Sequence, residues 1–377
     1  MTERVGDVDA PTVSFAPVAA PLRDVSGSRG AGLPVAVATA LVMTTYSYLF
    51  AMWPSRNDSV PSAVALVRRW VNEPLGIGED FGVLGISILL ICGGYTVASA
   101  TRRDGPARVA GCLALRAAVP ALVATLGSAT TVLLGGSPLT RPATVEVSAS
   151  DLAANVLLVD RVLGRPSLLE LSWVLTAGAL FCLFFAATRA LGERLPQAGD
   201  ALGLVTALTI VLTAAGSGGW YHQLGLIVSF VPMACVGRSL ADAGAGRAPA
   251  WSPVLAGTGT FVVLVAAERS YDELAGWWYP LTFVYAVLVV LLALAHGQRR
   301  AGNAPVRWLA GRGYQLLLFQ GVIGYALVGV LCSTAGLALW PALIAAAAVS
   351  CLAAECGFRV LRWFEARLPR PAYRNTS

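Results

Sequence analysis

The amino-acid sequence predicts an all-α, polytopic membrane protein with about ten transmembrane helices and both termini in the cytoplasm. Hydrophobic residues make up 56% of the chain and charged residues 13%, and the mean hydropathy is +0.68. This balance is far from that of a soluble globular protein. Apolar runs of about 20 residues, the length that crosses a bilayer, recur along the chain. Arginines gather in every second connection between these runs, which is typical of cytoplasmic loops.

The first expected span begins at about Leu33, with Pro34 in its first turn, where no amide donor is needed. Residues 1–30 lack apolar periodicity and are predicted to be a disordered cytoplasmic tail rather than a signal peptide. Residues 31–360 form one transmembrane domain, and 361–377 form a basic cytoplasmic tail. The ten spans are expected at about 33–53, 81–100, 109–135, 171–191, 201–216, 221–240, 253–268, 277–296, 314–333 and 337–358. The short link 216–219 makes the fifth and sixth spans an antiparallel pair.

The distribution of arginine sets the expected orientation. The two tails and the connections after the second, fourth, sixth and eighth spans hold 19 arginines, whereas the other connections hold 7. By the positive-inside rule the richer side is cytoplasmic. A lipid bilayer is therefore an expected partner, and the net charge of +6 does not indicate nucleic-acid binding.

Several kinds of chemistry are excluded by residues that the chain lacks. It contains no lysine, so it cannot have a P-loop lysine, a lysine Schiff base or a pyridoxal-phosphate site. Its only histidines, His222 and His296, are too few for a histidine-cluster metal site unless other ligands join them. The seven cysteines lie in apolar segments without a Cys-x-x-Cys pair, so we expect no structural disulfide. No metal or resident cofactor is expected.

Three segments carry polar or aromatic residues near the expected outer face. Residues 44–48, which include Tyr46, either form hydrogen bonds between helices or line a cavity. In the long connection 136–170, residues 151–160 are either a lid over an outward-facing cavity or a loop that merely packs across the bundle. Residues 277–279, Trp-Trp-Tyr, are interpreted as an interfacial aromatic belt.

Four arginines at the cytoplasmic ends of the second and third spans are candidates for anion binding: Arg102, Arg103, Arg108 and Arg116. Guanidinium pairs bidentately with phosphate, so these residues could hold the phosphates of coenzyme A. The alternative for Arg102 and Arg103 is a topology signal with contacts to anionic lipid. Arg116 lies about 12 Å deeper than Arg108 in a regular helix. A charge at that depth indicates a functional or partnered group.

Several blocks, in this order, resemble the bacterial integral-membrane acyltransferase-3 family. Residues 85–95, which contain Ser87, are similar to its Gly-Val-x-Leu-Phe-Phe-Val-Leu-Ser-Gly-Phe signature, and Arg102, Arg103 and 118–121 to the Arg-rich continuation. Residues 172–181, which contain Trp173, resemble its Ser-Trp-x-Leu-x-x-Glu-x-x-Phe helix, and 308–318 its Leu-Gly-x-Ser-Tyr-x-x-Tyr-Leu block. Arg29-Gly30 matches the Arg-Gly before the family's first helix.

The resemblance implies a bacterial plasma-membrane enzyme that moves an acyl group from cytoplasmic acyl-coenzyme A to a hydroxyl of a glycan, lipid or secondary metabolite. The donor would be a co-substrate and the acceptor a small molecule or glycan. We take as expected substrate-binding residues the four arginines above with Arg29, Ser87, Trp173, Gln320 and Tyr46. The oligomeric state is not predicted.

The chain also departs from the family pattern where acid–base groups are expected. The first-helix histidine of the family is replaced by Ala40, and the fourth-helix glutamate is absent near Thr176 and Gly178. A histidine that often closes the ninth-helix block is Gln320. Acyl transfer to a hydroxyl needs a group that takes its proton. Either another residue substitutes, or the fold is kept without this chemistry.

His222 is the candidate substitute, at the expected outer end of the sixth span beside Trp220 and Tyr221. The alternative is an interfacial histidine at a helix start. His296 is interpreted as a boundary residue at the inner end of the eighth span. The nearby acids contact an acceptor, supply a base, or are simply solvated: Glu79, Asp80, Glu268, Asp272 and Glu273.

Two further functions stay open beside acyl transfer. The first is an enzyme of altered reaction on an acyl or polyketide-like substrate. The second is a non-catalytic acyltransferase-like membrane protein that acts in transport, export, resistance or regulation. Inverted repeats would favour a transporter, and the sequence has no convincing internal repeat.

Overall fold

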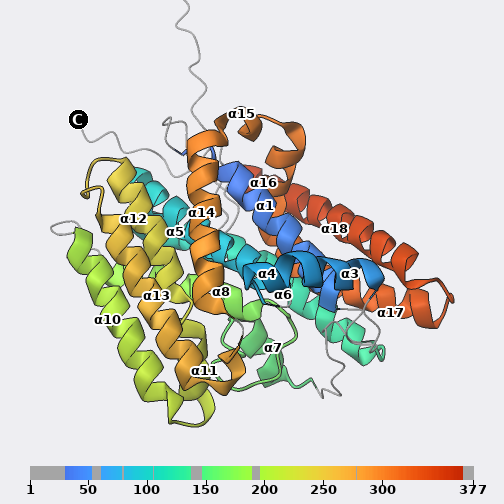
Figure 1. Ribbon diagram of the computed structural model, residues 1–377. Helices are drawn as coiled ribbons and strands as arrows, with labels where there is room; N and C mark the ends of the chain where they lie inside the picture. Colours follow the sequence, from blue (N-terminus) through green and yellow to red (C-terminus); the bar gives the residue numbers. More distant parts are fainter. Residues whose placement is uncertain are drawn as a thin grey trace, which may run out of the picture.

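The computed structural model describes residues 30–52, 61–78, 80–104, 106–136, 147–188, 196–276 and 278–367. For residues 102–104, 106–116, 196 and 364–367 it describes the backbone alone. All regular structure in these ranges is helical, and none of it is a β-strand (Figure 1). The predicted tail 1–30, apart from Gly30, and the tail beyond Arg367 lie outside the described residues.

The first half of the chain contains α1 (Leu33–Thr45), η2 (Tyr46–Ala51), α3 (Ser62–Val67), η3 (Arg68–Asn72), α4 (Glu73–Leu75), α5 (Gly82–Asp104), α6 (Pro106–Leu133), α7 (Ala149–Val156) and α8 (Ser172–Ala187). The second half contains α10 (Pro196–Ala215), α11 (Gly219–Val228), α12 (Val231–Gly244), α13 (Ser252–Ser270), η4 (Asp272–Leu274), α14 (Tyr279–His296), α15 (Gln298–Ala301), α16 (Ala304–Phe319), η5 (Gln320–Tyr325), α17 (Ala326–Ser333) and α18 (Leu339–Arg367).

Within the described residues, seven helices are long and apolar enough to cross a membrane: Leu33–Ala51, Gly82–Thr101, Gln197–Ala215, Gly219–Gly244, Tyr279–His296, Ala304–Ser333 and Leu339–Trp363. This confirms a multi-pass helical membrane protein. The other three expected spans fall on α6, α8 and α13. The count of ten and the side on which the termini lie stay predictions.

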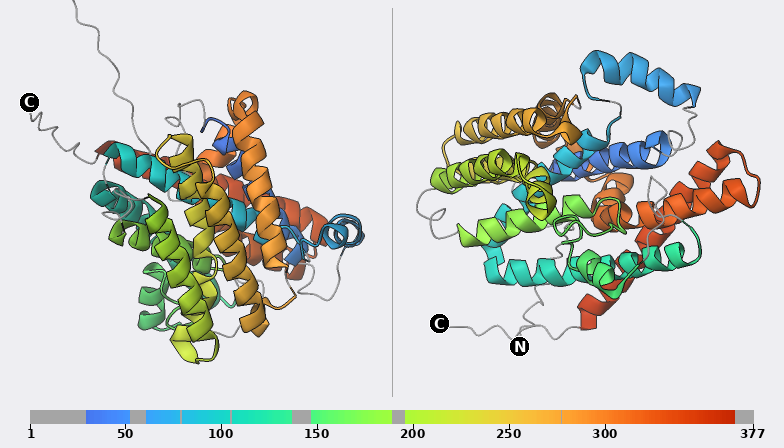
Figure 2. Two further views of the ribbon diagram at one scale, coloured as in Figure 1. Left: turned by 60° about the vertical axis from the view of Figure 1, so that its left-hand side comes forward. Right: turned by 90° about the horizontal axis from the view of Figure 1, so that it is seen from below.

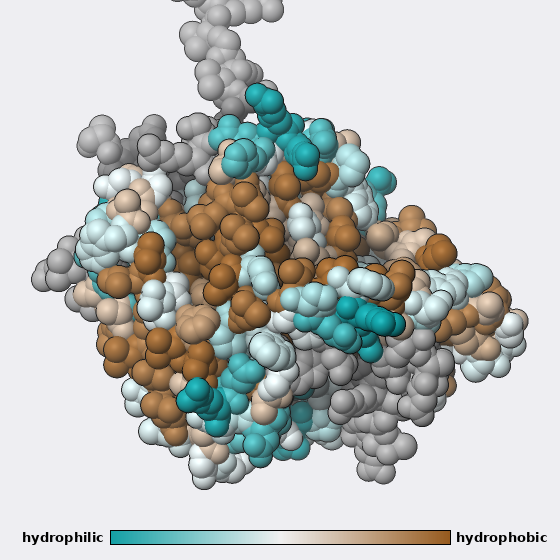
Figure 3. All heavy atoms as spheres, in the orientation of Figure 1, coloured by the Kyte–Doolittle hydropathy of each residue, from teal (hydrophilic) through white to brown (hydrophobic). Residues whose placement is uncertain are grey.

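The exterior carries the apolar surface that lipid contact requires. On the face formed by α13 and α14, apolar spheres lie between hydrophilic ends (Figure 3). Large hydrophobic side chains there are exposed, which in a soluble protein would be an aggregation hazard. They include Val254, Leu255, Phe261, Val262, Val284, Leu288, Leu291 and Leu292.

Helices α1, α5 and α12 form the centre of the bundle, with α10 and α13 on one side and α17 and α18 on the other (Figures 1 and 2). Helices α5 and α12 approach each other closely at two glycines. A Cβ on Gly94 would lie 1.9 Å from the carbonyl oxygen of Ala234, and one on Gly237 would lie 1.8 Å from that of Ile91. Small residues at such crossings let membrane helices pack by van der Waals contact.

Three expected spans are interrupted rather than regular. The sixth breaks at Ser229 and Phe230, because Pro232 occupies the first turn of α12 and cannot continue α11. The first and ninth contain the π-helical segments η2 and η5. Thr45 donates to Gln320 at 3.1 Å, and Tyr325 donates to the Tyr48 carbonyl, so the two segments are joined. π-Helical turns are frequent at functional sites.

A buried ionic cluster joins α10 to α12 at the end of the bundle opposite the link 216–218. The Nε of Arg238 lies 3.5 Å from Asp200 and 3.8 Å from Asp242, and all three side chains are buried. The guanidinium also stacks 4.7 Å from the ring of Phe185. Arg247, which is half exposed, contacts Asp242 from outside. Arg238 is therefore the buried cation shared by both carboxylates, and Arg247 adds a second, half-exposed cation at Asp242.

Arg238→Met is expected to destabilise the protein by about 3–5 kcal/mol, because it leaves Asp200 buried without its cation and Asp242 with the half-exposed Arg247 alone. Thermal unfolding of the purified protein in detergent, with the midpoint converted to free energy, measures the loss. Arg247→Met removes an exposed partner of the same Asp242 and should cost about 1 kcal/mol or less. Equal losses in the two variants would contradict this account of the cluster.

The six cysteines with described side chains are free thiols, and Cys112 lies among those described by backbone alone. Near the end of α18, Glu355 accepts from Arg359, one turn later in the same helix, at 2.7 Å. It also accepts from Trp308 at 2.9 Å and pairs with Arg312, which ties α18 to α16.

Candidate functional site

The ends of six helices meet around one cavity, as helices that alternate in direction require. The central cavity, of about 270 Å³, lies among η2, the starts of α5, α8 and α14, the second half of α11, and η4. Its polar and aromatic lining includes Tyr48, Asp80, Arg161, Trp173, Glu273 and Tyr279. A second, more open space of about 740 Å³, the mouth cavity, lies beside it and shares Arg161 and Gln223.

His222 and Glu273 form a pair at the boundary between the two cavities. His222, in the first turns of α11, lines the mouth cavity, and Glu273, in η4, lines the central cavity. The Nε2 of His222 lies 3.0 Å from the Oε1 of Glu273. The ring of Tyr271 meets that of His222 edge-on at 5.0 Å, and its hydroxyl donates to the Val211 carbonyl at 3.0 Å. One nitrogen of the imidazole is thus engaged and the ring is held in place.

The local electrostatics keep the carboxylate of this pair charged. Hydrogen bonds from its own backbone amide and from His222 lower the pKa of Glu273 below its ordinary value, because they favour the ionised form. An ionised carboxylate that accepts from one ring nitrogen orients an imidazole and makes its other nitrogen a better base. The pair therefore has the form of a histidine–carboxylate general base.

Arg161 enters the site from the long connection before α8. Its neighbours are fixed by hydrogen bonds to α8: Ser172 donates to Asp160 at 3.0 Å, and Thr176 donates to the Leu158 carbonyl at 2.6 Å. Burial raises the pKa of the Asp160 carboxyl above its ordinary value, although the bonds from Ser167 and Ser172 oppose that shift. The connection therefore holds Arg161 at a defined place between the two cavities.

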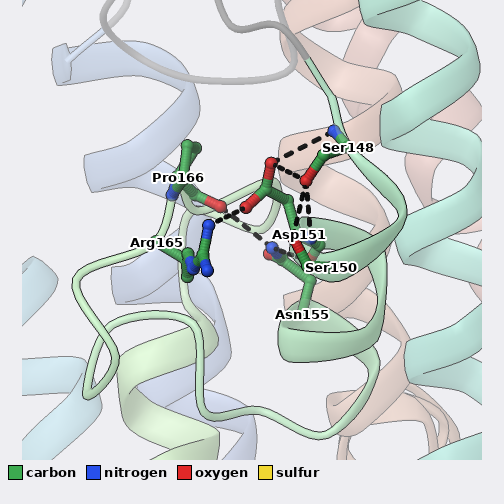
Figure 4. Close-up of polar contacts among 6 residues, drawn as sticks. All are labelled: Ser148, Ser150, Asp151, Asn155, Arg165 and Pro166. Carbon is green, nitrogen blue, oxygen red and sulfur yellow. Dashed lines mark hydrogen bonds and ion pairs between the residues drawn. The ribbon is translucent and has the colours of Figure 1, made fainter.

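The same connection begins with a capped helix that packs on α6. Ser148 and Asp151 form a capping box at the start of α7, which is why the chain turns helical there. The amide of Asn155 donates to the Asp151 and Pro166 carbonyls at 2.8 and 2.9 Å (Figure 4). Its Oδ1 accepts from the backbone amide of Leu168 at 2.7 Å. Residues 151–160 thus pack across the bundle beside the cavities, the arrangement common to both predicted alternatives.

An apolar cavity of about 350 Å³ lies among α5, α6, α8, α12 and α16. On α8 its lining runs from Val174 to Ala186, which corresponds to about 18 Å along a regular helix. Gly93, Gly94 and Gly178 open the space because they lack side chains. Its walls are almost entirely apolar, in contrast to the central cavity.

The predicted substrate-binding residues divide into those at the site and those in the packing. Trp173 lines the central cavity and packs on Phe230 at 5.0 Å. Tyr46 packs on Phe81 at 5.8 Å and is absent from the described cavity linings. Ser87 is buried and donates to the Val83 carbonyl of its own helix at 2.8 Å. Gln320 is the buried link from η5 to Thr45. Of these four, only Trp173 faces the central cavity.

The arginines predicted to bind the acyl donor lie on segments for which the structure describes the backbone alone, or outside the described residues. Arg102, Arg103, Arg108 and Arg116 lie on the backbones of α5 and α6, but their side chains are outside the described residues. Arg29 lies outside them altogether. The donor half of the site therefore stays a prediction from the sequence.

The positions at which family residues are missing serve packing. Ala40 is fully buried where α1 crosses α5, and its carbonyl oxygen would lie 2.7 Å from a Cβ on Gly85. Thr176 is bonded to the Leu158 carbonyl, and Gly178 lines the apolar cavity. Neither region carries a titratable side chain in place of the missing histidine or glutamate.

Arg161, Gln223 and Tyr279 are site residues that sequence reasoning missed. Tyr279 was assigned to an aromatic belt, but it lines the central cavity and meets Phe230 edge-on at 5.4 Å. The adjacent Trp278 is 56% exposed, for which the belt stays a prediction, and Trp277 lies outside the described residues. The signal that could have indicated Arg161 was a group of three arginines, Arg141, Arg161 and Arg165, in a connection predicted to lie outside the cytoplasm.

Within the described ranges, no group of three or more His, Cys, Asp or Glu side chains is placed to hold a metal ion. Comparisons of the chain with protein-family models, with curated proteins and with solved structures found no match. The site is therefore interpreted from its own geometry and from the sequence resemblance.

Proposed function

We propose that the protein is a membrane-embedded acyltransferase that moves an acyl group from cytoplasmic acyl-coenzyme A to a hydroxyl of a glycan, lipid or secondary metabolite. The observation that carries the proposal is the His222–Glu273 pair at 3.0 Å between two cavities. The sequence resemblance supplies the reaction class, and the pair supplies the base that the class needs where the family's own histidine is absent.

In this mechanism His222 removes the proton of the acceptor hydroxyl while Glu273 stabilises the charged ring. The hydroxyl oxygen attacks the thioester carbonyl carbon, the C–O bond forms, and the C–S bond breaks. The proton held by His222 passes to the departing thiolate of coenzyme A. The products are the ester and free coenzyme A, and no oxidant or metal enters the balance.

The acyl donor has to extend from the cytoplasmic arginines to the central cavity. The apolar cavity is an elongated space for an acyl chain or the thioester arm, because it follows α8 from its first turn to its last. Arg116 and the arginines near it would hold the phosphates of coenzyme A at the end of the apolar cavity that lies away from the central cavity. This division assigns the donor to the apolar cavity and the acceptor to the central and mouth cavities.

The proposal is tested with membranes from cells that express the chain and from cells that express Arg116→Ala. The membranes are incubated with acetyl- and palmitoyl-coenzyme A labelled in the acyl carbonyl, and label is counted in the lipid, glycan and small-molecule fractions. Transfer by the wild-type chain, lost in Arg116→Ala, is the expected result. Absence of transfer above that of membranes without the chain, in every fraction, would refute an acyltransferase.

A second candidate is a non-catalytic acyltransferase-like protein that acts in transport, export or resistance. The observation in its favour is that Ala40 and Thr176 are buried packing residues where the family carries acid–base groups. Equilibrium binding separates the two functions. This candidate predicts that purified protein binds acyl-coenzyme A without releasing coenzyme A, or does not bind it.

A further inference from the structure

The mouth cavity is lined by two arginines, a histidine and two serines. Arg161, Arg165 and His222 line it together with Ser167 and Ser217, and none of its described lining residues is a carboxylate. In the central cavity next to it, Asp80 and Glu273 supply the opposite charge. The positive charge of the site is therefore concentrated on the side that is open to solvent.

Arg161 has unused hydrogen-bonding capacity. Its guanidinium carries five N–H donors, and its one recorded bond is a long one, from Nη2 to the Glu170 carbonyl at 3.5 Å. Its Nε is buried without a partner, and no carboxylate among the described residues lies within ion-pair distance of it. The side chain as a whole is half-buried, and the charge that acts on it comes from Asp160, whose carboxylate does not bond to the guanidinium. Arg161 therefore has free N–H donors for a bound anionic ligand.

Arg165 is available at the same place. It is half exposed, and its contact with Asp151 is a loose one of 3.5 Å from Nη1 to Oδ1 (Figure 4). The hydrogen bonds from Ser148 lower the pKa of Asp151 below its ordinary value, so this carboxylate stays charged and keeps Arg165 beside the cavity. Two guanidinium groups, four residues apart in one connection, therefore face the same space.

We propose that the mouth cavity binds a phosphate group of the acceptor, held by Arg161 and Arg165. That the bound molecule is the acyl acceptor rests on the proposed function, whereas the binding of phosphate at this site does not. Phosphate has enough acceptor oxygens for two bidentate guanidinium groups and a serine hydroxyl, which a single carboxylate lacks. A volume of about 740 Å³ admits a phosphate with the group that carries it. The acceptor is thus a phosphorylated lipid or a soluble phosphorylated compound, with its hydroxyl directed to His222.

Binding measurements on the purified full-length protein in detergent test the site without any need for catalysis. The probes are inorganic phosphate, for the soluble source, and dihexanoyl phosphatidic acid, for the lipid source, in titration calorimetry. We expect binding of at least one probe, weakened about tenfold or more in Arg161→Gln, because one bidentate charge pair is lost. Tighter binding of the lipid than of inorganic phosphate assigns a lipid acceptor, and equal binding assigns a soluble one.

Arg247→Gln is the matched control, because it removes an arginine that is also half exposed and paired with an aspartate, at the opposite end of the bundle. It should bind both probes as the wild type does. Arg165→Gln supplies a second variant should Arg161→Gln not fold, and it is expected to weaken binding about threefold or more because this arginine is more solvated.

Absence of binding by both probes, or equal affinity in wild type and both Arg161 and Arg165 variants, would overturn the inference. Phosphate binding that depends on Arg161 in a protein without acyl transfer would leave the inference intact and refute the proposed function. Acyl transfer that is unchanged in Arg161→Gln and Arg165→Gln, in a protein that does not bind phosphate, would refute the inference and leave the proposed function intact.

Discussion

Replacement of His222 by glutamine is expected to lower the rate of acyl transfer by about 10²–10⁴-fold, the usual contribution of a general base. Glutamine can still donate a hydrogen bond to Glu273 but cannot take up a proton at neutral pH. The rate is measured with saturating acyl-coenzyme A in membranes normalised for the amount of folded protein. The loss should appear in kcat, because His222 acts on the proton and not on donor binding.

His296→Gln is the control for this experiment. The chain has only two histidines, and His296 is exposed at the end of α14, far in the fold from the central cavity. Its replacement should leave the rate within about twofold of wild type, as expected for a surface change. A His222→Gln variant with the wild-type rate would remove this residue from the mechanism and leave the chain without a known base.

The pH dependence of the rate distinguishes a base from a structural histidine. Because its hydrogen bonds lower the pKa of Glu273 below its ordinary value, this carboxylate stays charged in the neutral range. The rate should fall on acidification, because a protonated imidazole cannot take up the proton of the acceptor hydroxyl. Glu273→Gln should lower the rate, because it removes the negative charge that stabilises the protonated ring.

The sequence was sufficient for the class of fold because the bilayer imposes a length and a polarity on each span. The ranges 81–100 and 277–296 agree with α5 and α14 to within a few residues. Interruptions were harder to predict. Pro232 was a readable signal for the break between α11 and α12, whereas η2 and η5 depend on contacts between segments about 275 residues apart, such as Thr45 with Gln320.

The site was predictable only where a residue type is rare. His222 was identified because the chain has two histidines, and its partner Glu273 was one of several acids expected near the same face. Arg161 and Tyr279 were missed because the face of a helix or loop that lines a cavity is decided by packing. In an apolar helix a tyrosine at a cavity and a tyrosine at the lipid interface have the same sequence context. The missing family histidine at Ala40 was also misleading, since it drew attention to a position that serves helix packing.

A large effect on folding is expected from alanine at Gly94. Its Cβ would lie 1.9 Å from the Ala234 carbonyl oxygen, which belongs to the backbone of α12 and cannot rotate away. Helices α5 and α12 would have to separate, at the centre of the bundle, and the cost should reach about 3 kcal/mol or more, the upper part of the range for overpacking. The measurement is the yield of monodisperse protein in detergent, together with the midpoint of thermal unfolding.

Gly257→Ala is the matched control, because a Cβ at this position of α13 meets nothing within 4 Å. It should be neutral or stabilise the helix by up to about 1 kcal/mol, since alanine restricts the unfolded chain more than glycine does. Gly237→Ala should be as damaging as Gly94→Ala, because its Cβ would lie 1.8 Å from the Ile91 carbonyl oxygen at the same crossing. The double variant should cost less than the sum, since one displacement of α12 relieves both contacts. Full additivity would mean that the two glycines serve separate contacts and that the α5–α12 crossing is not one rigid unit.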